Sequence, residues 1–307
     1  MINKIVQSMA DAMDGIKDGS VVLLGGFGSV GQPNALIDGL IEHGATDLTV
    51  ACMQVPLVEA SAFGVMAVDG GNRVVAFDEK PEHPRAMPDA PGQALVSMGI
   101  YVFGKDLLME QLRSDSPREA STHDFGKDLI PRLISTHKVH AYAFGGLRGR
   151  VTPDRYWRDV GTLDAYYDAN MDLLKPAPPL DLYQRDWSIR TYHGQNPPAR
   201  MVAGAHGTEG LLANSILGAG TVIAGGFVRH SILSSRVRVQ EGAVIEDAIL
   251  FDNVTVGAGA RLRRCIVDKE VVIPPGETLG YDLARDAARF TLSDNGIVVV
   301  PEEYRFE

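Results

Sequence analysis

Four stretches in the last third of the chain decide its fold: 215-SILGAGTVI-223, 231-SILSSRVRV-239, 248-AILFDNVTV-256 and 265-CIVDKEVVI-273. They begin at steps of 16, 17 and 17 residues, and apolar residues recur about every six positions within each step. This period predicts three columns of aliphatic side chains. The columns are Leu217, Leu233, Leu250 and Val267; Ile223, Val239, Val256 and Ile273; and Val228, Ile245, Leu262 and Leu279.

One inward aliphatic residue on each of three short strands per coil predicts a triangular prism whose coils bury their aliphatic residues against one another. The pattern is typical of a left-handed parallel β-helix of the hexapeptide type. The segment 281–290 is predicted to form a helix that caps one end. Some hexapeptide prisms transfer acyl groups with a histidine, but His230, the only histidine within the coils, has no obvious partner in the sequence. The repeat therefore favours a structural and assembly role.

Composition narrows the function classes. The chain has 307 residues, enough for two domains, and its formal net charge of −10 argues against a nucleic-acid partner. The two cysteines, Cys52 and Cys265, form neither a disulfide framework nor a zinc pattern, so we expect both in apolar cores. We find no signal peptide and no segment long enough to cross a bilayer, and we expect a cytoplasmic protein.

A glycine loop near the start, 23-LLGGFGSVGQP-33, contains the pattern G-x-G-x-x-G between a predicted strand and a predicted helix. Such a loop can hold a phosphate on backbone N–H groups. A dinucleotide site also needs an acidic residue at the end of the next strand, whereas Asp47 stands at the start of the predicted strand 47–53. The dinucleotide interpretation is therefore weak.

The longer stretch from Asp18 to Pro33 resembles the glycine signature of the small subunit of class I coenzyme A transferases, and the resemblance covers roughly residues 1–50. In that family this loop helps to form the coenzyme A site. The family's glutamate nucleophile lies on the other subunit, and nothing in this chain supplies it.

The middle of the chain alternates predicted strands and helices. Two strands are expected on either side of the turn 69–72, and further strands at 97–103 and 138–144. A helix is expected after His123, with Asp124 as its N-cap. These elements carry a series of phrases in a fixed order: ASAFGVM, DEKP, SMGIYVF, HDFGKDLIP, YWRDVGT and WSIRTY.

The ordered phrases resemble the bacterial type of glucose-1-phosphate adenylyltransferase from about residue 51 to the C-terminus. That family joins ATP and glucose 1-phosphate into ADP-glucose and releases pyrophosphate, in bacterial glycogen synthesis. The resemblance implies an α/β, Rossmann-like nucleotidyltransferase domain followed by a left-handed β-helix. It also implies allosteric control and a homo-oligomer, a tetramer in the family, assembled through the β-helix.

The same resemblance implies site residues. Lys80 would hold the sugar phosphate, Glu79 would bind sugar hydroxyls, and Asp159 would be one of two carboxylates on Mg²⁺. Lys269 matches a position that contacts an activator in some members. The remaining substrate-binding residues implied by the resemblance are Gly64, Ser97, Asp124 and Trp157.

Each of these residues also has an ordinary interpretation when it is seen alone. Glu79, Lys80 and Lys269 could be solvated surface charges. Asp159 could cap the helix that follows it, and Trp157 could belong to a core. Only the ordered set of phrases favours the functional interpretation.

The family's ATP loop, G-G-x-G-[ST]-R-L, and its second metal-binding aspartate have no counterpart in this sequence. We therefore predict a composite chain with an incomplete α/β domain and impaired or absent adenylyltransferase activity. Its predicted parts are a coenzyme A transferase-like segment (1–50), the C-terminal part of a nucleotidyltransferase domain (51–175), a linker (176–210) and the β-helix (211–307). The alternatives are a fragment of the small subunit of a coenzyme A transferase and a non-catalytic subunit with a regulatory or assembly role.

Overall fold

A computed structural model describes residues 22–24, 48–143, 156–180, 182–183 and 194–306. The chain divides into two compact units, 1–155 and 156–307. The glycine loop and the helices expected around it lie outside the described residues, as does part of the predicted linker. Within the described part, no helix is both long and apolar enough to cross a lipid bilayer.

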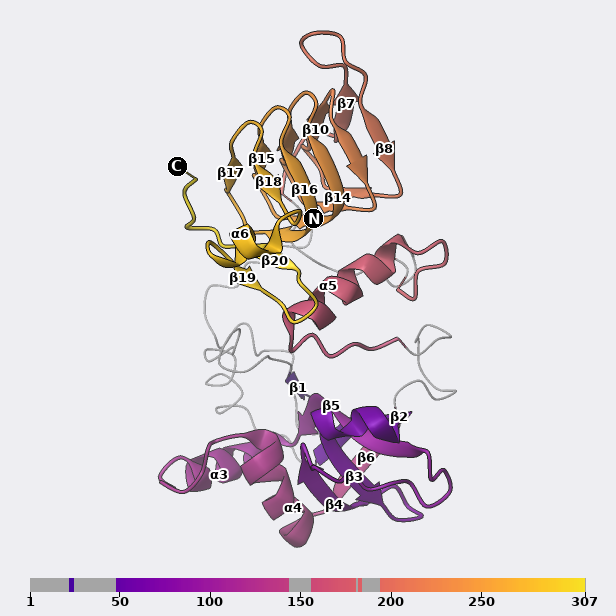
Figure 1. The fold of residues 1–307 in the computed structure, drawn as a ribbon. Helices are drawn as coiled ribbons and strands as arrows, with labels where there is room; N and C mark the ends of the chain where they lie inside the picture. The colour runs from indigo at the N-terminus through magenta and orange to yellow at the C-terminus, as the bar shows by residue number, and fades with distance from the viewer. Residues whose placement is uncertain (1–21, 25–47, 144–155, 181, 184–193, 307) are drawn as a thin grey trace. The chain divides into compact units, whose positions relative to one another are not determined.

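The first unit is built on a six-stranded mixed sheet (Figure 1). Its strands follow the order β4-β3-β5-β2-β6, and β1 pairs with β5. Strands β2 and β6 run parallel, whereas the other pairs are antiparallel. The strands are β1 (Val22–Leu24), β2 (Leu48–Pro56), β3 (Gly64–Val68), β4 (Val74–Glu79), β5 (Gln93–Phe103) and β6 (Val139–Ala143).

The helices of this unit pack against the sheet through apolar side chains. Helices α3 (Lys105–Asp115) and α4 (Ile130–Thr136) contribute Leu108, Ile130 and Leu133 to a core that also contains buried strand residues. A turn of π-helix, η2 (Phe125–Leu129), leads directly into α4. A smaller apolar cluster surrounds the 3₁₀ segment η1 (Leu57–Ala62). The predicted strands, and the predicted helix after Asp124, are therefore confirmed.

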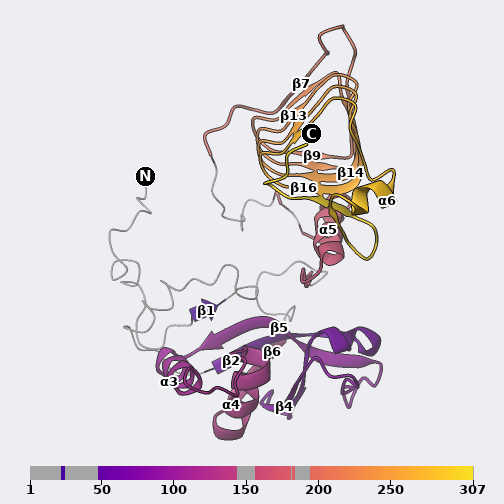
Figure 2. The ribbon, with the colours of Figure 1, turned by 60° about the vertical axis from the view of Figure 1, so that its left-hand side comes forward.

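The second unit contains a parallel β-helix of stacked short strands (Figure 2). Leu233 pairs in register with Leu217 and Leu250, and the other two predicted columns are matched in register in the same way. The central members of the columns are buried. Its strands are β7 (Arg200–Val202), β8 (Leu211–Ala213), β9 (Ile216–Leu217), β10 (Val222–Ala224), β11 (Phe227–Arg229), β12 (Ile232–Leu233), β13 (Arg238–Val239), β14 (Val244–Leu250), β15 (Thr255–Val256), β16 (Arg261–Val267), β17 (Val272–Ile273) and β18 (Thr278–Leu279).

The end of the β-helix is closed by more than the helix expected at 281–290. Helix α6 is shorter, Leu283–Ala287, and the hairpin of β19 (Thr291–Leu292) and β20 (Val298–Val300) follows it. Strand β20 adds to β16 and continues the stacking. Three aromatic rings pack beside it, with Arg289 over their faces: Phe290, Tyr304 and Phe306.

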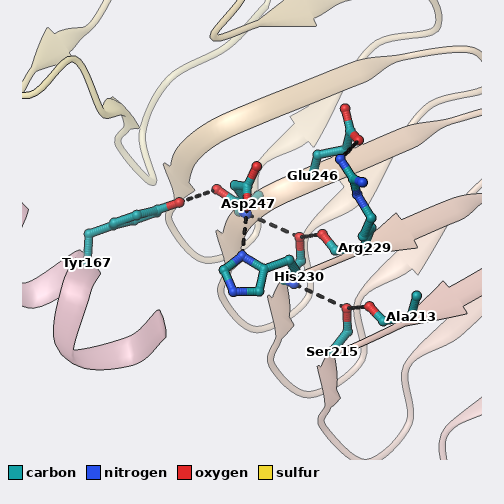
Figure 3. Close-up of polar contacts among 9 residues, drawn as sticks. Tyr167, Ala213, Ser215, Arg229, His230, Glu246 and Asp247 are labelled. Atoms are coloured by element: carbon teal, nitrogen blue, oxygen red, sulfur yellow. Dashed lines mark hydrogen bonds and ion pairs between the residues drawn. The ribbon is translucent and has the colours of Figure 1, made fainter. Parts of the chain in front are cut away.

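Helix α5 (Leu163–Met171) and the 3₁₀ turn η3 (Asp172–Leu174) pack on the β-helix through Tyr167, Met171 and Leu174, which join a cluster with Ile249 and Ile266. The Tyr167 hydroxyl donates a hydrogen bond of 2.7 Å to the backbone carbonyl of Asp247 (Figure 3). Burial raises the pKa of Tyr167, which keeps this hydroxyl protonated as a donor. The boundaries that we expect for the domains stay predictions, but this helix lies in the unit of the β-helix.

The same corner of the β-helix corrects one expectation. His230 does have a partner: its Nδ1 lies 2.7 Å from Oδ1 of Asp247, one coil further along (Figure 3). The two residues are separated by 17 positions, one coil of the repeat, so both occupy the same corner. Both also adopt left-handed backbone conformations, with φ of 46° and 50°. Their pairing joins successive coils.

Both cysteines are buried and free, as expected of core residues. Burial raises the pKa of Cys52 to about 11 and that of Cys265 to about 12. Both side chains are therefore unreactive thiols at neutral pH.

We expect Leu250→Ala to destabilise the β-helix by about 2–5 kcal/mol, because it removes a fully buried side chain from the middle of an aliphatic column. Val272→Ala is the control, since Val272 is 62% exposed on β17 of the same β-helix, and its effect should stay within about 0.5 kcal/mol. Urea unfolding followed by circular dichroism measures both changes. Equal effects of the two substitutions would contradict the column as the source of stability.

Candidate active site

A cluster of predicted site residues forms where strand β4 ends. Glu79 is the last residue of β4 and pairs in register with Gly64, the first residue of β3. A Cβ atom on Gly64 would lie 2.5 Å from Cζ of Phe77 and 2.8 Å from Oε2 of Glu79. Glycine is therefore required at this position to make room for two side chains of the neighbouring strand.

The Glu79 carboxylate also packs against η2. A Cβ on Gly126 would collide with Oε2 of Glu79 and lie 3.3 Å from Oδ1 of Asp124. Asp124 is the N-cap of η2, where its Oδ1 accepts hydrogen bonds from the backbone N–H groups of Gly126 (2.8 Å) and Lys127 (2.9 Å). This confirms the predicted cap and places a second carboxylate beside Glu79.

The electrostatics of the two carboxylates follow from this packing. Burial raises the pKa of Glu79, and the negative charge of Asp124 adds to the increase. The positive charges of Lys80 and Lys127 act in the opposite direction. Lys80 is exposed and adopts a left-handed conformation, with φ of 46°, while its backbone N–H donates to the carbonyl of Phe63.

Strand β5 brings a hydroxyl pair to the same cluster. Ser97 is buried, and its Oγ lies 3.4 Å from the hydroxyl of Tyr101. Burial raises the pKa of Tyr101, and the charges of Glu79 and Asp124 raise it further. The Tyr101 ring stacks on that of Phe125 in η2, with ring centroids 5.5 Å apart.

A β-bulge orients this part of β5. Ala51 of β2 pairs with Ile100, whereas its neighbour Cys52 pairs with Ser97, so Met98 and Gly99 are extra residues. Gly99 has a φ of 68°, and its N–H donates to Oγ of Ser97 at 3.2 Å. Bulges commonly redirect side chains next to functional sites.

The structure therefore brings together five of the predicted residues in one place: Gly64, Glu79, Lys80, Ser97 and Asp124. The sequence prediction did not include Tyr101, Gly126 and Lys127. The phrases that indicated the site also contain these residues: Gly126 and Lys127 belong to HDFGKDLIP, and Tyr101 belongs to SMGIYVF.

Three predicted residues lie in the second unit. Trp157 is half-buried and Asp159 is exposed. Asp159 does not cap the following helix, because the N-cap of α5 is Thr162, whose Oγ1 accepts from the N–H of Ala165. Lys269 is exposed and forms an ion pair of 3.0 Å with Glu302. Their substrate, metal and effector roles stay predictions.

We expect Asp124→Asn to lower the pKa of Glu79, because it removes the neighbouring negative charge while asparagine caps a helix as well as aspartate does. A raised pKa means that protonation of Glu79 favours the folded state. This contribution to the free energy of unfolding is fully present below the ordinary pKa of glutamate and is lost as the pH rises through the raised pKa of Glu79 in the folded state. Because Asp124→Asn brings that pKa closer to its ordinary value, the substitution should stabilise the protein at neutral pH.

A pH titration of the Glu79 carboxyl carbon by NMR measures the change. The control is Asp78→Asn, because Asp78 precedes Glu79 but is exposed and pairs with Arg85. An unchanged Glu79 titration in Asp124→Asn would show that the two carboxylates do not interact.

Comparisons with known proteins cover both units. The family model described as nucleotidyl transferase matches residues 3–176, and the one described as GlmU-like C-terminal hexapeptide matches residues 197–300. The coenzyme A transferase resemblance of residues 1–50 and the truncation of the nucleotidyltransferase domain stay predictions.

Several curated relatives are identical to this chain at about half of the aligned residues. Glucose-1-phosphate adenylyltransferase 2 of Vibrio cholerae serotype O1 is 54% identical over 272 residues, which are 89% of this chain and 67% of the relative. The protein of the same name in Vibrio parahaemolyticus is 53% identical over the same shares of both chains. Glucose-1-phosphate adenylyltransferase of Paramagnetospirillum magneticum is 48% identical over 84% of this chain and 60% of the relative. The chain therefore belongs to the glucose-1-phosphate adenylyltransferase family of nucleotidyl transferases.

Proposed function

We propose that the cluster around Glu79 binds glucose 1-phosphate, and that the chain derives from an enzyme that joins this sugar phosphate to the adenylyl group of ATP. One observation supports the proposal above all: the Asp124 carboxylate, the two hydroxyls of β5 and two lysines lie around the Glu79 carboxylate, in the room that Gly64 of β3 leaves for it. Carboxylates suit sugar hydroxyls, and lysine suits a phosphate. The names of the relatives support the same substrate.

The proposed roles follow from the chemistry of adenylyl transfer. An oxygen of the sugar phosphate attacks the α-phosphate of ATP, and pyrophosphate leaves. Such a reaction depends on positioning and on charge neutralisation more than on covalent help from the protein. Lys80 would place the attacking phosphate, while Glu79 and Asp124 would orient the sugar. Ser97 and Tyr101 add hydroxyl groups that can donate or accept.

Mg²⁺ is the metal that we propose for the reaction, and it would neutralise charge on the phosphates of ATP. Asp159 supplies an exposed carboxylate of the kind that Mg²⁺ prefers. Across the described segments, His, Cys, Asp and Glu side chains do not gather in groups of three or more that could hold a metal. One or two carboxylates together with substrate phosphates are a common arrangement for this ion.

The sequence has no G-G-x-G-[ST]-R-L loop for the triphosphate, so we expect this chain by itself to form ADP-glucose slowly or not at all while still binding the sugar phosphate. We also propose assembly into a homo-oligomer through the β-helix, with Lys269 near an effector site.

The test is an assay of the purified chain with ATP, glucose 1-phosphate and Mg²⁺ that follows pyrophosphate release, together with calorimetry for each ligand. Binding of glucose 1-phosphate without turnover supports both parts of the proposal. Rapid formation of ADP-glucose would contradict the impaired turnover. Failure to bind glucose 1-phosphate would contradict the site itself and favour a non-catalytic assembly subunit.

We expect Lys80→Gln to weaken glucose 1-phosphate binding by about 10- to 100-fold, the loss typical of a charged hydrogen bond. Binding of ATP should not change, because the proposed partner of Lys80 is the sugar phosphate. Lys138→Gln is the matched control, since Lys138 is an exposed lysine of the same unit that precedes β6. Calorimetry with both ligands measures the effect, and equal losses for the two ligands would argue against a role at the sugar phosphate.

A further inference from the structure

The loop that precedes η2 is anchored by a buried carboxylate. Asp115, the last residue of α3, is 2% exposed. Its Oδ2 accepts a hydrogen bond of 2.8 Å from Oγ of Ser121 and lies 2.9 Å from Nδ1 of His123. Its Oδ1 forms an ion pair of 2.7 Å with Arg132 of α4. Asp115 therefore connects α3, the loop and α4.

His123 needs this anchor because its backbone is strained. Its φ is 59°, in the left-handed region that is unfavourable for residues with a Cβ atom. The backbone N–H of His123 donates to Oγ of Ser121 at 3.1 Å, and Nδ1 donates to Asp115, since a carboxylate can only accept. The contacts of Asp115 thus hold an unfavourable backbone conformation in place.

The next residue is Asp124, so the conformation of His123 determines where the site's second carboxylate lies. On the other side of the loop, Oδ2 of Asp128 accepts from the backbone N–H groups of Thr122 (3.0 Å) and Asp124 (3.1 Å). Residues 121–124 are therefore held by Asp115 of α3 and by Asp128 of η2, and Gly126 follows them against the Glu79 carboxylate.

The charge of Asp115 agrees with an anchoring role. Burial raises the pKa of this carboxyl group, but hydrogen bonds from His123 and Ser121 and the charge of Arg132 outweigh the increase. The net result is a lowered pKa, so the carboxylate is ionised and accepts hydrogen bonds at neutral pH.

We propose that Asp115 is a positioning residue for the glucose 1-phosphate site: through His123 it fixes the left-handed turn that sets Asp124 and Gly126 against Glu79. The inference rests on the proposed function, but it concerns the geometry of the cluster and can be measured without a ligand. Neither Asp115 nor His123 needs to touch the substrate.

The experiment compares two substitutions at one exposed position. The His123 side chain is 56% exposed, so neither substitution should prevent folding. His123→Ala removes the anchor and keeps the strain, whereas His123→Gly removes the anchor and also the strain, because glycine adopts this φ freely. Asp115→Asn weakens the anchor from the other side. The control is His137→Ala, which removes a histidine that contacts Thr136 at the end of α4.

Two readouts are needed for each variant: the titration of the Glu79 carboxyl group by NMR, and calorimetric binding of glucose 1-phosphate and of ATP. We expect His123→Ala and Asp115→Asn to lower the pKa of Glu79 and to weaken glucose 1-phosphate binding about tenfold, with ATP binding unchanged. His123→Gly should restore most of the binding and the Glu79 titration. His137→Ala should leave both unchanged.

If His123→Gly and His123→Ala weaken glucose 1-phosphate binding equally, the positioning role is overturned, because the imidazole itself would then contact the ligand. An unchanged Glu79 titration in His123→Ala would overturn it as well. If the unsubstituted chain fails to bind glucose 1-phosphate, the proposed function fails, and the Glu79 titration still decides whether Asp115 positions the cluster.

Discussion

The Glu79 carboxylate can lie where it does only because two glycines from separate elements leave room for it. Gly64 makes room from the neighbouring strand and Gly126 from the π-helical turn, and a methyl group at either position would meet Oε2. The end of β4 and the start of η2 are thus in direct contact. The lysines, the hydroxyl pair and the second carboxylate are all arranged around this contact, so the geometry of the cluster depends on it.

The second unit is organised by a different constraint. Each coil of the β-helix buries its aliphatic side chains only against adjacent coils, so its stability is close to a sum of nearest-neighbour contacts. The repeat continues along the axis until an element without the period closes it, which here is β20 with the aromatic residues beside Arg289. Helix α5 covers part of the outside through Tyr167 and Met171, which shows that the coils also support packing on their outer surface.

The parts of the fold that could be predicted from the sequence are those that repeat or that act locally. The aliphatic columns are in register as predicted, because a period of 16 or 17 residues leaves a single way to stack the coils. Asp124 could be predicted as a cap because an N-cap bonds only to the next few residues. The turn between β3 and β4 is equally local. Two features that the sequence did not predict depend on contacts between distant segments. The bulge at Met98 and Gly99 is defined by pairing with β2, which lies much earlier in the chain. The pairing of His230 with Asp247 requires the coils to be stacked first.

The charges of the cluster also restrict what it can bind. Glu79 and Asp124 repel a bare phosphate, whereas Lys80 and Lys127 attract one, and these opposing charges act within the same small region. A ligand gains from both sets only if it offers hydroxyl donors to the carboxylates and an anionic group to the lysines. A sugar phosphate has both, and a free phosphate or a neutral sugar has only one. If the cluster is the sugar-phosphate site that we propose, its selectivity would depend on keeping the two carboxylates and the lysines at fixed positions. The strained turn at His123 and its buried anchor would then contribute to binding by holding Asp124 in place.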